Sequence, residues 1–149
     1  MPTLSRWCMR AALLYLVIGF TLGGALLLAK AGVVDLRVWL WLPAHVDVLI
    51  VGWMMQTAMG VAFWILPRRR LVGRGRTELA WASFALLNTG LVVSAGFSWL
   101  QFWLPNWGWL HEAFPLGLAL QVLALIVFAG YAWARVLPTI TLTKSQSHS

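Results

Sequence analysis

Four long apolar runs limit what this chain can fold into more than any other feature. They cover about residues 10–29, 45–66, 79–100 and 113–136, and nearly all ionisable residues fall in the gaps between them. An apolar helix needs about 20 residues to cross the hydrocarbon core of a bilayer. Charged residues make up only 10% of the chain, whereas soluble domains carry about 25%. The sequence therefore predicts an integral membrane protein.

The expected fold is all-α, an integral membrane four-helix bundle. In lipid, every backbone polar group must be satisfied within a helix or a closed barrel, and none of the runs alternates as barrel strands do. We expect residues 1–138 to form one four-span domain and the polar segment 139–149 to be disordered. The first run is too long for a signal peptide and no clear cleavage site follows it, so we expect it to remain as a span.

The basic residues predict how the spans are oriented. The N-terminal segment, the arginine-rich segment 67–78 and the C-terminal segment hold most of the Lys and Arg, whereas Lys30 and Arg37 stand alone on the opposite side. We expect the protein to lie in the inner (cytoplasmic) membrane of the cell. The positive-inside rule then places both of its termini in the cytoplasm. We interpret the net charge of +7 as topology signals and lipid contacts, and not as a nucleic-acid surface.

The second span has the pattern that most resembles a cofactor site. At 3.6 residues per turn, His45, Gly52, Gln56 and Gly60 fall on one side of the helix. A histidine beside a glycine-lined face can hold haem, because the imidazole ligates iron and the small residues admit the flat ring. The alternative is ordinary: glycine and glutamine at helical spacing also serve helix packing.

Asp47, His111 and Glu112 are further polar residues predicted near the outer ends of spans. We expect Asp47 to lie in the first turn of its helix, where a negative charge is favoured by the helix dipole. Together with His45, these residues leave open an outer copper or zinc site.

The remaining polar residues of the spans predict helix contacts. Gly19 and Gly23 have the small-xxx-small spacing of close helix pairs, and Gly90, Ser94 and Ser98 form a stripe. Asn88 and Gln121 are the candidates for hydrogen bonds between helices. We expect no acidic or basic side chain in the middle of a span, which argues against a transporter.

The second span and its flanks resemble the catalytic subunit, subunit I, of haem–copper oxidases, including the cytochrome c and cbb3 types. The resemblance rests on His45, Gly52 and Gly60, on the sequence Ile-Leu-Pro at 65–67, and on Phe-Ala-Leu-Leu-Asn at 84–88. The first span, with Tyr15, Gly19 and Gly23, is similar to the first helix of that family. The resemblance as a whole covers about residues 6–100.

The resemblance implies that His45 ligates a low-spin haem, of the haem b type, with Gly52, Gln56 and Gly60 along the ring. The family's other metal ligands lie on later helices that this chain lacks, so it cannot be a complete oxidase alone and is not expected to be an independent enzyme. The expected function is electron transfer, or haem or gas handling, in a respiratory complex. The partners are lipid and either a second copy or other respiratory subunits. The alternative is an accessory membrane subunit without a cofactor.

Overall fold

The computed structural model describes residues 2–66, 75–104, 106 and 110–136. The described part is helical, and four of its helical segments are long and apolar enough to cross a membrane. They confirm the expected all-α fold with four spans. The arginine-rich segment before Gly75 and the tail 139–149 lie outside the described residues.

Each span is longer than its apolar run predicts. The first is α1, Thr3–Lys30, and the last two are α4, Gly75–Trp103, and α5, Leu110–Val136. The second span is a continuous helix, Leu36–Ile65. Helices extend beyond their apolar cores because the flanking polar residues satisfy their backbone groups in the same way.

The second span changes its helical form along its length. A 3₁₀ turn, η1 (Leu36–Trp41), leads into α2 (Leu42–Asp47), then a π-helical stretch, η2 (Val48–Met55), and finally α3 (Gln56–Ile65). Asp35 caps the start, because its side chain accepts a hydrogen bond from the Arg37 amide at 2.8 Å. π-Helix is rare and is found frequently at functional sites.

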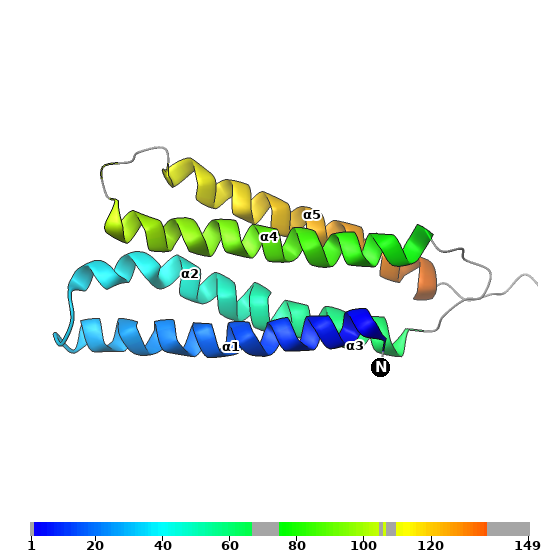
Figure 1. Ribbon diagram of the computed structural model, residues 1–149, viewed down its shortest axis with the longest axis horizontal. Coiled ribbons are helices and arrows are strands. Elements are labelled where there is room, and N and C mark those ends of the chain that lie inside the picture. Colours follow the sequence, from blue (N-terminus) through cyan, green and yellow to red (C-terminus); the bar gives the residue numbers. More distant parts are fainter. Residues whose placement is uncertain (1, 67–74, 105, 107–109, 137–149) are drawn as a thin grey trace, which may run out of the picture.

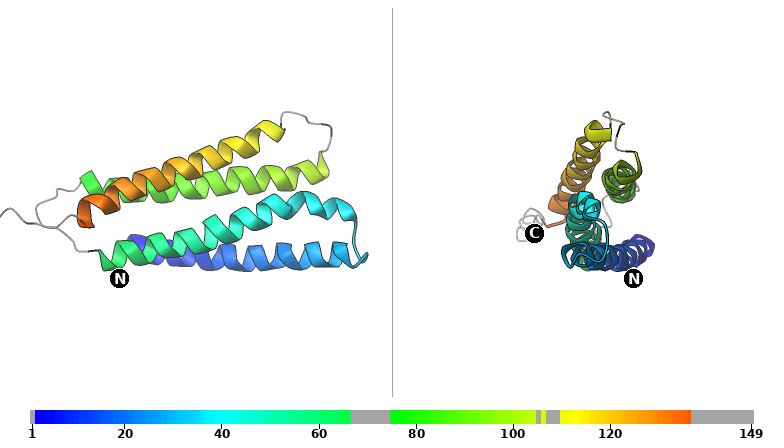
Figure 2. Two further views of the ribbon diagram at one scale, coloured as in Figure 1. Left: turned by 180° about the vertical axis from the view of Figure 1, so that it is seen from behind. Right: turned by 90° about the vertical axis from the view of Figure 1, so that its left-hand side faces the viewer.

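The spans form two hairpins that pack side by side (Figure 1). The second span lies centrally and contacts α1 on one side and α4 on the other. We call the end where α1 ends and η1 begins the distal end. The chain enters α1 and leaves α5 at the opposite end (Figures 1 and 2). In the end-on view of Figure 2, α5 approaches the second span away from the distal end and diverges from it at the distal end.

Small residues bring the helices of each hairpin together. A side-chain carbon added at Gly90 of α4 would lie 2.7 Å from the Gly117 carbonyl oxygen of α5, so the two backbones nearly touch. Gly19 of α1 receives the Leu49 side chain, and Gly23 receives the His45 ring. These contacts confirm that both glycine patterns mark helix interfaces.

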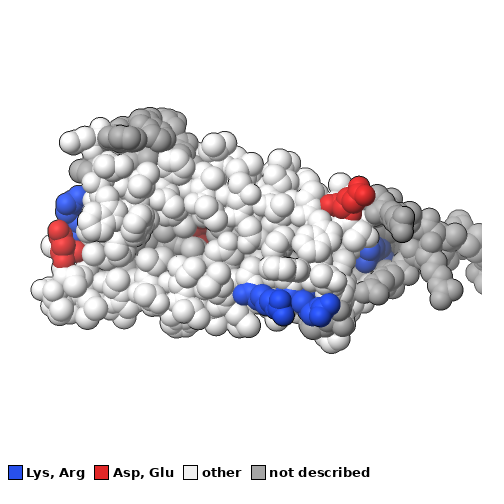
Figure 3. Space-filling view, viewed as in Figure 1, with Lys and Arg blue, Asp and Glu red and all other residues white. Residues whose placement is uncertain are grey.

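The outer surface of the bundle is strongly apolar. Large hydrophobic side chains such as Val17, Phe20, Val92 and Ile126 are more than half exposed. On the face shown in Figure 3, most of the surface is uncharged; most of the charged residues lie nearer the two ends, and a small acidic patch is visible near the middle. This distribution matches a chain whose long sides contact lipid.

Candidate functional site

His45 lies on α2 and points toward α1. Its Nδ1 is 2.8 Å from the backbone carbonyl oxygen of Gly19. A carbonyl oxygen only accepts hydrogen bonds, so Nδ1 carries the hydrogen in the neutral ring and Nε2 keeps a free electron pair. Gly23 permits this placement, because a side-chain carbon there would lie 2.8 Å from His45 Cε1. The ring is therefore fixed in position and in tautomer.

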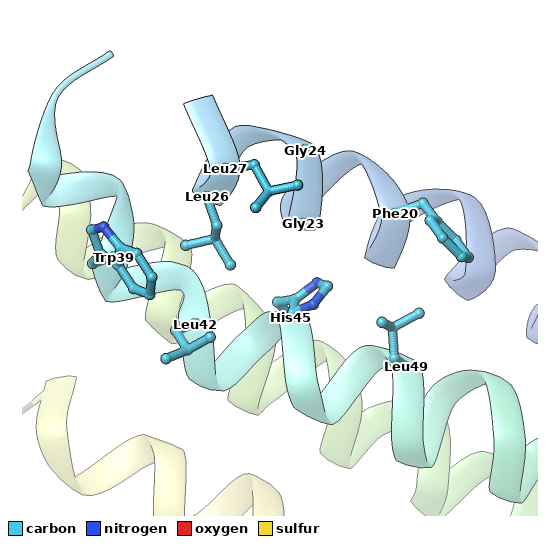
Figure 4. Close-up of a pocket in the computed structure, with 9 residues that line it drawn as sticks. All are labelled: Phe20, Gly23, Gly24, Leu26, Leu27, Trp39, Leu42, His45 and Leu49. Atoms are coloured by element: carbon cyan, nitrogen blue, oxygen red, sulfur yellow. The ribbon is translucent and has the colours of Figure 1, made fainter. Parts of the chain in front are cut away.

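A groove of about 560 Å³ opens beside the His45 ring, between α1 and the start of the second span (Figure 4). Its walls are almost entirely apolar, with Phe20, Leu27 and Trp39 among the lining residues. Gly24 also lines it, and a side-chain carbon added at Gly24 would meet nothing within 4 Å. The volume falls in the range of small-molecule sites, about 300–1,000 Å³.

The other three residues that the sequence singled out do not line this groove. Gly52 packs against Tyr15 of α1, and Gly60 packs against Cys8 of the same helix. Like His45, both glycines thus face α1, as their spacing predicts. Gln56 instead faces α4, where its Nε2 lies 3.4 Å from Asn88 Oδ1.

Asp47 occupies a position that the sequence analysis assigned wrongly. The helix begins at Leu36, so Asp47 lies well past its first turn, and its side chain is only 6% exposed. Its Oδ2 accepts a short hydrogen bond from Ser94 Oγ of α4 and a bond of 2.8 Å from Gln121 Nε2 of α5. No acidic side chain was expected in the middle of a span, yet the buried Asp47 lies eleven residues after the start of the span at Leu36.

Ser94, which contacts Asp47, lies two and a half turns before α4 ends at Trp103. At a rise of 1.5 Å per residue, the Asp47 contact is about 14 Å along the helix from that end. The stripe containing Ser94, together with Gln121, was visible in the sequence as an interface. Asp47 lies on the side of its helix opposite His45, which would have pointed to that interface. The misplaced start of the span concealed the connection.

A second polar group lies deeper in the bundle. Tyr15 Oη donates to Asn88 Oδ1 at 2.9 Å, and Asn88 Nδ2 donates to the Phe84 carbonyl oxygen of its own helix at 2.7 Å. Gln56 is completely buried, and its Oε1 has no hydrogen-bond partner among the described residues. Asn88 and Gln121 therefore both form the interhelical hydrogen bonds expected of them.

Grooves flank the second span on both sides. The second groove, of about 460 Å³, lies between this span and α5, and Asp47 lines it with Val46, Ile50, Phe114 and Leu118 among others. It forms because α5 diverges from the second span at the distal end.

No group of three potential metal-ligating side chains exists among the described residues. His45 and Asp47 point to different neighbours, α1 for the first and α4 and α5 for the second. The side chains of His111 and Glu112 lie outside what the structure describes. The open copper or zinc site of the sequence analysis stays a hypothesis without a ligand set.

Comparison with known proteins found no matching family model, curated protein or solved structure.

Proposed function

We propose that the protein is a haem-associated integral membrane protein, related to oxidase subunit I, that acts in electron transfer or haem or gas handling within a respiratory complex. One observation carries the proposal. His45 holds its Nδ1 on the Gly19 carbonyl oxygen and keeps Nε2 free of hydrogen bonds to the residues described. Metal-ligating histidines have this arrangement, because the second nitrogen fixes the ring and its tautomer.

The groove beside His45 supports the proposal. Its walls are apolar, and Gly24 leaves the space next to the helix backbone open. A flat macrocycle needs such a cleft, since a side chain in its place would block access to the imidazole. In this proposal Gly24 leaves room for the macrocycle and Gly23 leaves room for the His45 imidazole. Gly52, Gln56 and Gly60, which were expected along the macrocycle, instead pack the spans together.

The proposed cofactor is haem b, whose iron would supply one-electron transfer or binding of a gas. His45 would provide one axial ligand. The described residues offer no second histidine near the groove, so the other ligand would come from a second copy or a neighbouring subunit, or the iron would be five-coordinate. The protein is accordingly proposed as a component of an assembly, and not as an independent enzyme.

Absorption spectra of the purified protein test this proposal. The protein is expressed with ample haem precursor, and spectra of the oxidised and reduced forms are recorded in detergent. We expect a Soret band that His45→Ala abolishes. Gly24→Leu should abolish it too, because the new side chain fills the groove without contacting the His45–Gly19 bond.

Gly96→Leu is the matched control for Gly24→Leu. A side-chain carbon added at Gly96 also meets nothing within 4 Å, but this residue lies on α4, away from the groove. Its Soret band should equal that of the natural sequence. A colourless natural protein, or a Soret band that survives both His45→Ala and Gly24→Leu, would contradict the haem proposal.

A second candidate function is an accessory membrane subunit without a cofactor. The observation in its favour is that His45 already has a structural task, since it ties α2 to α1. In addition, only 17% of an 18-residue apolar stretch of α1 is buried against the rest of the chain. A long face of α1 is therefore left for other subunits. This function predicts a colourless protein in which His45→Ala loosens the α1–α2 contact.

We also propose that both termini lie in the cytoplasm, with the distal end facing outward, as the distribution of arginine indicates. In that orientation, the mouth of the His45 groove is near the outer surface of the inner membrane.

A further inference from the structure

A buried carboxylate with one free oxygen lies on the side of the second span opposite His45. Asp47 Oδ2 receives both of the hydrogen bonds described above, from Ser94 and Gln121. Its Oδ1 has no hydrogen-bond or ion-pair partner among the residues that the structure describes. A carboxylate taken out of water without a counter-charge is strongly disfavoured. An acidic residue in such a position is a functional-site hypothesis by default.

The groove that Asp47 lines indicates what would approach the free oxygen. Apart from Asp47, the residues lining its volume of about 460 Å³ are all apolar. Phe114 lines it and contributes an aromatic ring, and ring faces attract cations. A ligand for this groove therefore combines an apolar body with one positive charge.

A smaller, more polar cavity lies next to this groove, toward the distal end. This cavity, of about 240 Å³, shares Pro43 and Phe114 with the groove and is lined by Ser98 and Gln101 of α4. Ser98 donates to the backbone carbonyl oxygen of Ser94, whose side chain in turn contacts Asp47. Hydrogen bonds thus link Ser98, which lines the smaller cavity, to the Ser94 residue that contacts the carboxylate.

A bare metal cation fits this groove less well. Hard cations take about six to eight oxygen ligands, and Asp47 is the single ionisable residue among those that line the two neighbouring cavities. An anion would be repelled by the carboxylate. A basic side chain of a partner helix remains the competing occupant, and the experiment below separates it from a small molecule.

We propose that the groove between α2 and α5 binds a monovalent organic cation with an apolar body, whose charge pairs with Asp47 Oδ1. The proposal does not rest on haem binding, because this groove lies on the other side of the span and shares only Leu42 with the lining of the His45 groove.

Equilibrium dialysis of the full chain in phosphatidylcholine nanodiscs tests the proposal. The probe is tetraphenylphosphonium, and tetraphenylborate, which has the same shape and the opposite charge, is the control ligand. Empty nanodiscs measure partitioning into lipid. We expect saturable binding of tetraphenylphosphonium, at one site per chain, and none of tetraphenylborate above the empty-nanodisc level.

Two substitutions locate the binding. Asp47→Asn keeps the size of the side chain and removes its charge, and Ile50→Trp fills the groove from a half-exposed position without altering Asp47. Each should weaken binding by about tenfold or more. Asp35→Asn is the matched control, because this exposed acid lies at the start of η1 and lines neither cavity. The Asp35→Asn protein should bind tetraphenylphosphonium as the natural protein does.

Several results would overturn the proposal. One is binding by the natural protein no greater than that of empty nanodiscs. Another is full binding by a monodisperse Asp47→Asn protein. If Asp47→Asn does not fold, retained binding in Ile50→Trp has the same meaning. A natural protein that binds no probe but whose self-association depends on Asp47 would assign the groove to a basic side chain of a partner.

Discussion

His45 and Asp47 are two residues apart, yet they serve opposite sides of one helix. His45 bonds to a backbone carbonyl of α1, whereas Asp47 bonds to side chains of α4 and α5. Asp47 is buried and His45 is partly buried, and the polar atoms of both side chains form hydrogen bonds to neighbouring helices. The energetic contribution of each can be measured by removing that partner.

Removing the Ser94 hydroxyl should destabilise the protein more than removing the Tyr15 hydroxyl. Ser94→Ala leaves the buried Asp47 carboxylate with one fewer donor, and an underbonded buried polar group costs about 1–3 kcal/mol. We expect the free energy of unfolding, measured by titration with sodium dodecyl sulfate, to fall by that amount. Thr21→Ala is the control, since this exposed hydroxyl bonds only to the Val17 carbonyl oxygen of its own helix. Equal losses for both variants would contradict the assignment.

Removing the Tyr15 hydroxyl should have a smaller effect. Tyr15→Phe deletes one neutral bond between α1 and Asn88 of α4, and such bonds in membrane proteins contribute about 0.6 kcal/mol on average. The same titration should show a loss below that of Ser94→Ala. A loss larger than that of Ser94→Ala would mean that the deeper polar group, and not the Asp47 cluster, dominates the interior.

At the scale of elements, the spans could be predicted but their inner form could not. Apolar runs mark spans because the bilayer demands them, so all four appear where expected. The 3₁₀ turn before Pro43 and the π-helical stretch Val48–Met55 leave no such mark. They explain why Asp47 was assigned to a first turn, and why Gln56 was grouped with the face toward α1.

The crossing of α4 and α5 is the element contact most sensitive to size. Gly90→Ala would place a carbon 2.7 Å from the Gly117 carbonyl oxygen, and a backbone cannot move aside as a flexible side chain can. Overpacking of this kind costs about 1–3 kcal/mol. We expect a matching loss in the unfolding titration, whereas Gly130→Ala, which adds a carbon in open space on α5, should be close to neutral.

At the scale of the whole molecule, an even number of spans returns the chain to the side where it began. This part of the topology follows from the helices. The side itself is predicted from charge, and much of that charge lies in segments outside the described residues. The His45 groove shows the same limit: the imidazole and its glycine neighbours were visible in the sequence, but Gly24 and the apolar walls come from the arrangement of α1 against η1 and α2.

Reporter fusions test the orientation. A fusion of green fluorescent protein to the C-terminus should fluoresce, and a fusion of alkaline phosphatase at the same place should be inactive, because the C-terminus is predicted in the cytoplasm. A phosphatase fusion truncated after Lys30 should be active, since that point follows one span. The reverse pattern would invert the molecule and place the mouths of both grooves on the cytoplasmic side.

His45 and Asp47 are only two residues apart on α2, so a rotation of this short helix moves both side chains. A turn of this short segment about its own axis that draws the imidazole off the Gly19 oxygen must also swing the carboxylate relative to Ser94 and Gln121. A ligand that entered one groove and rotated the backbone there would therefore change the contacts of the other groove.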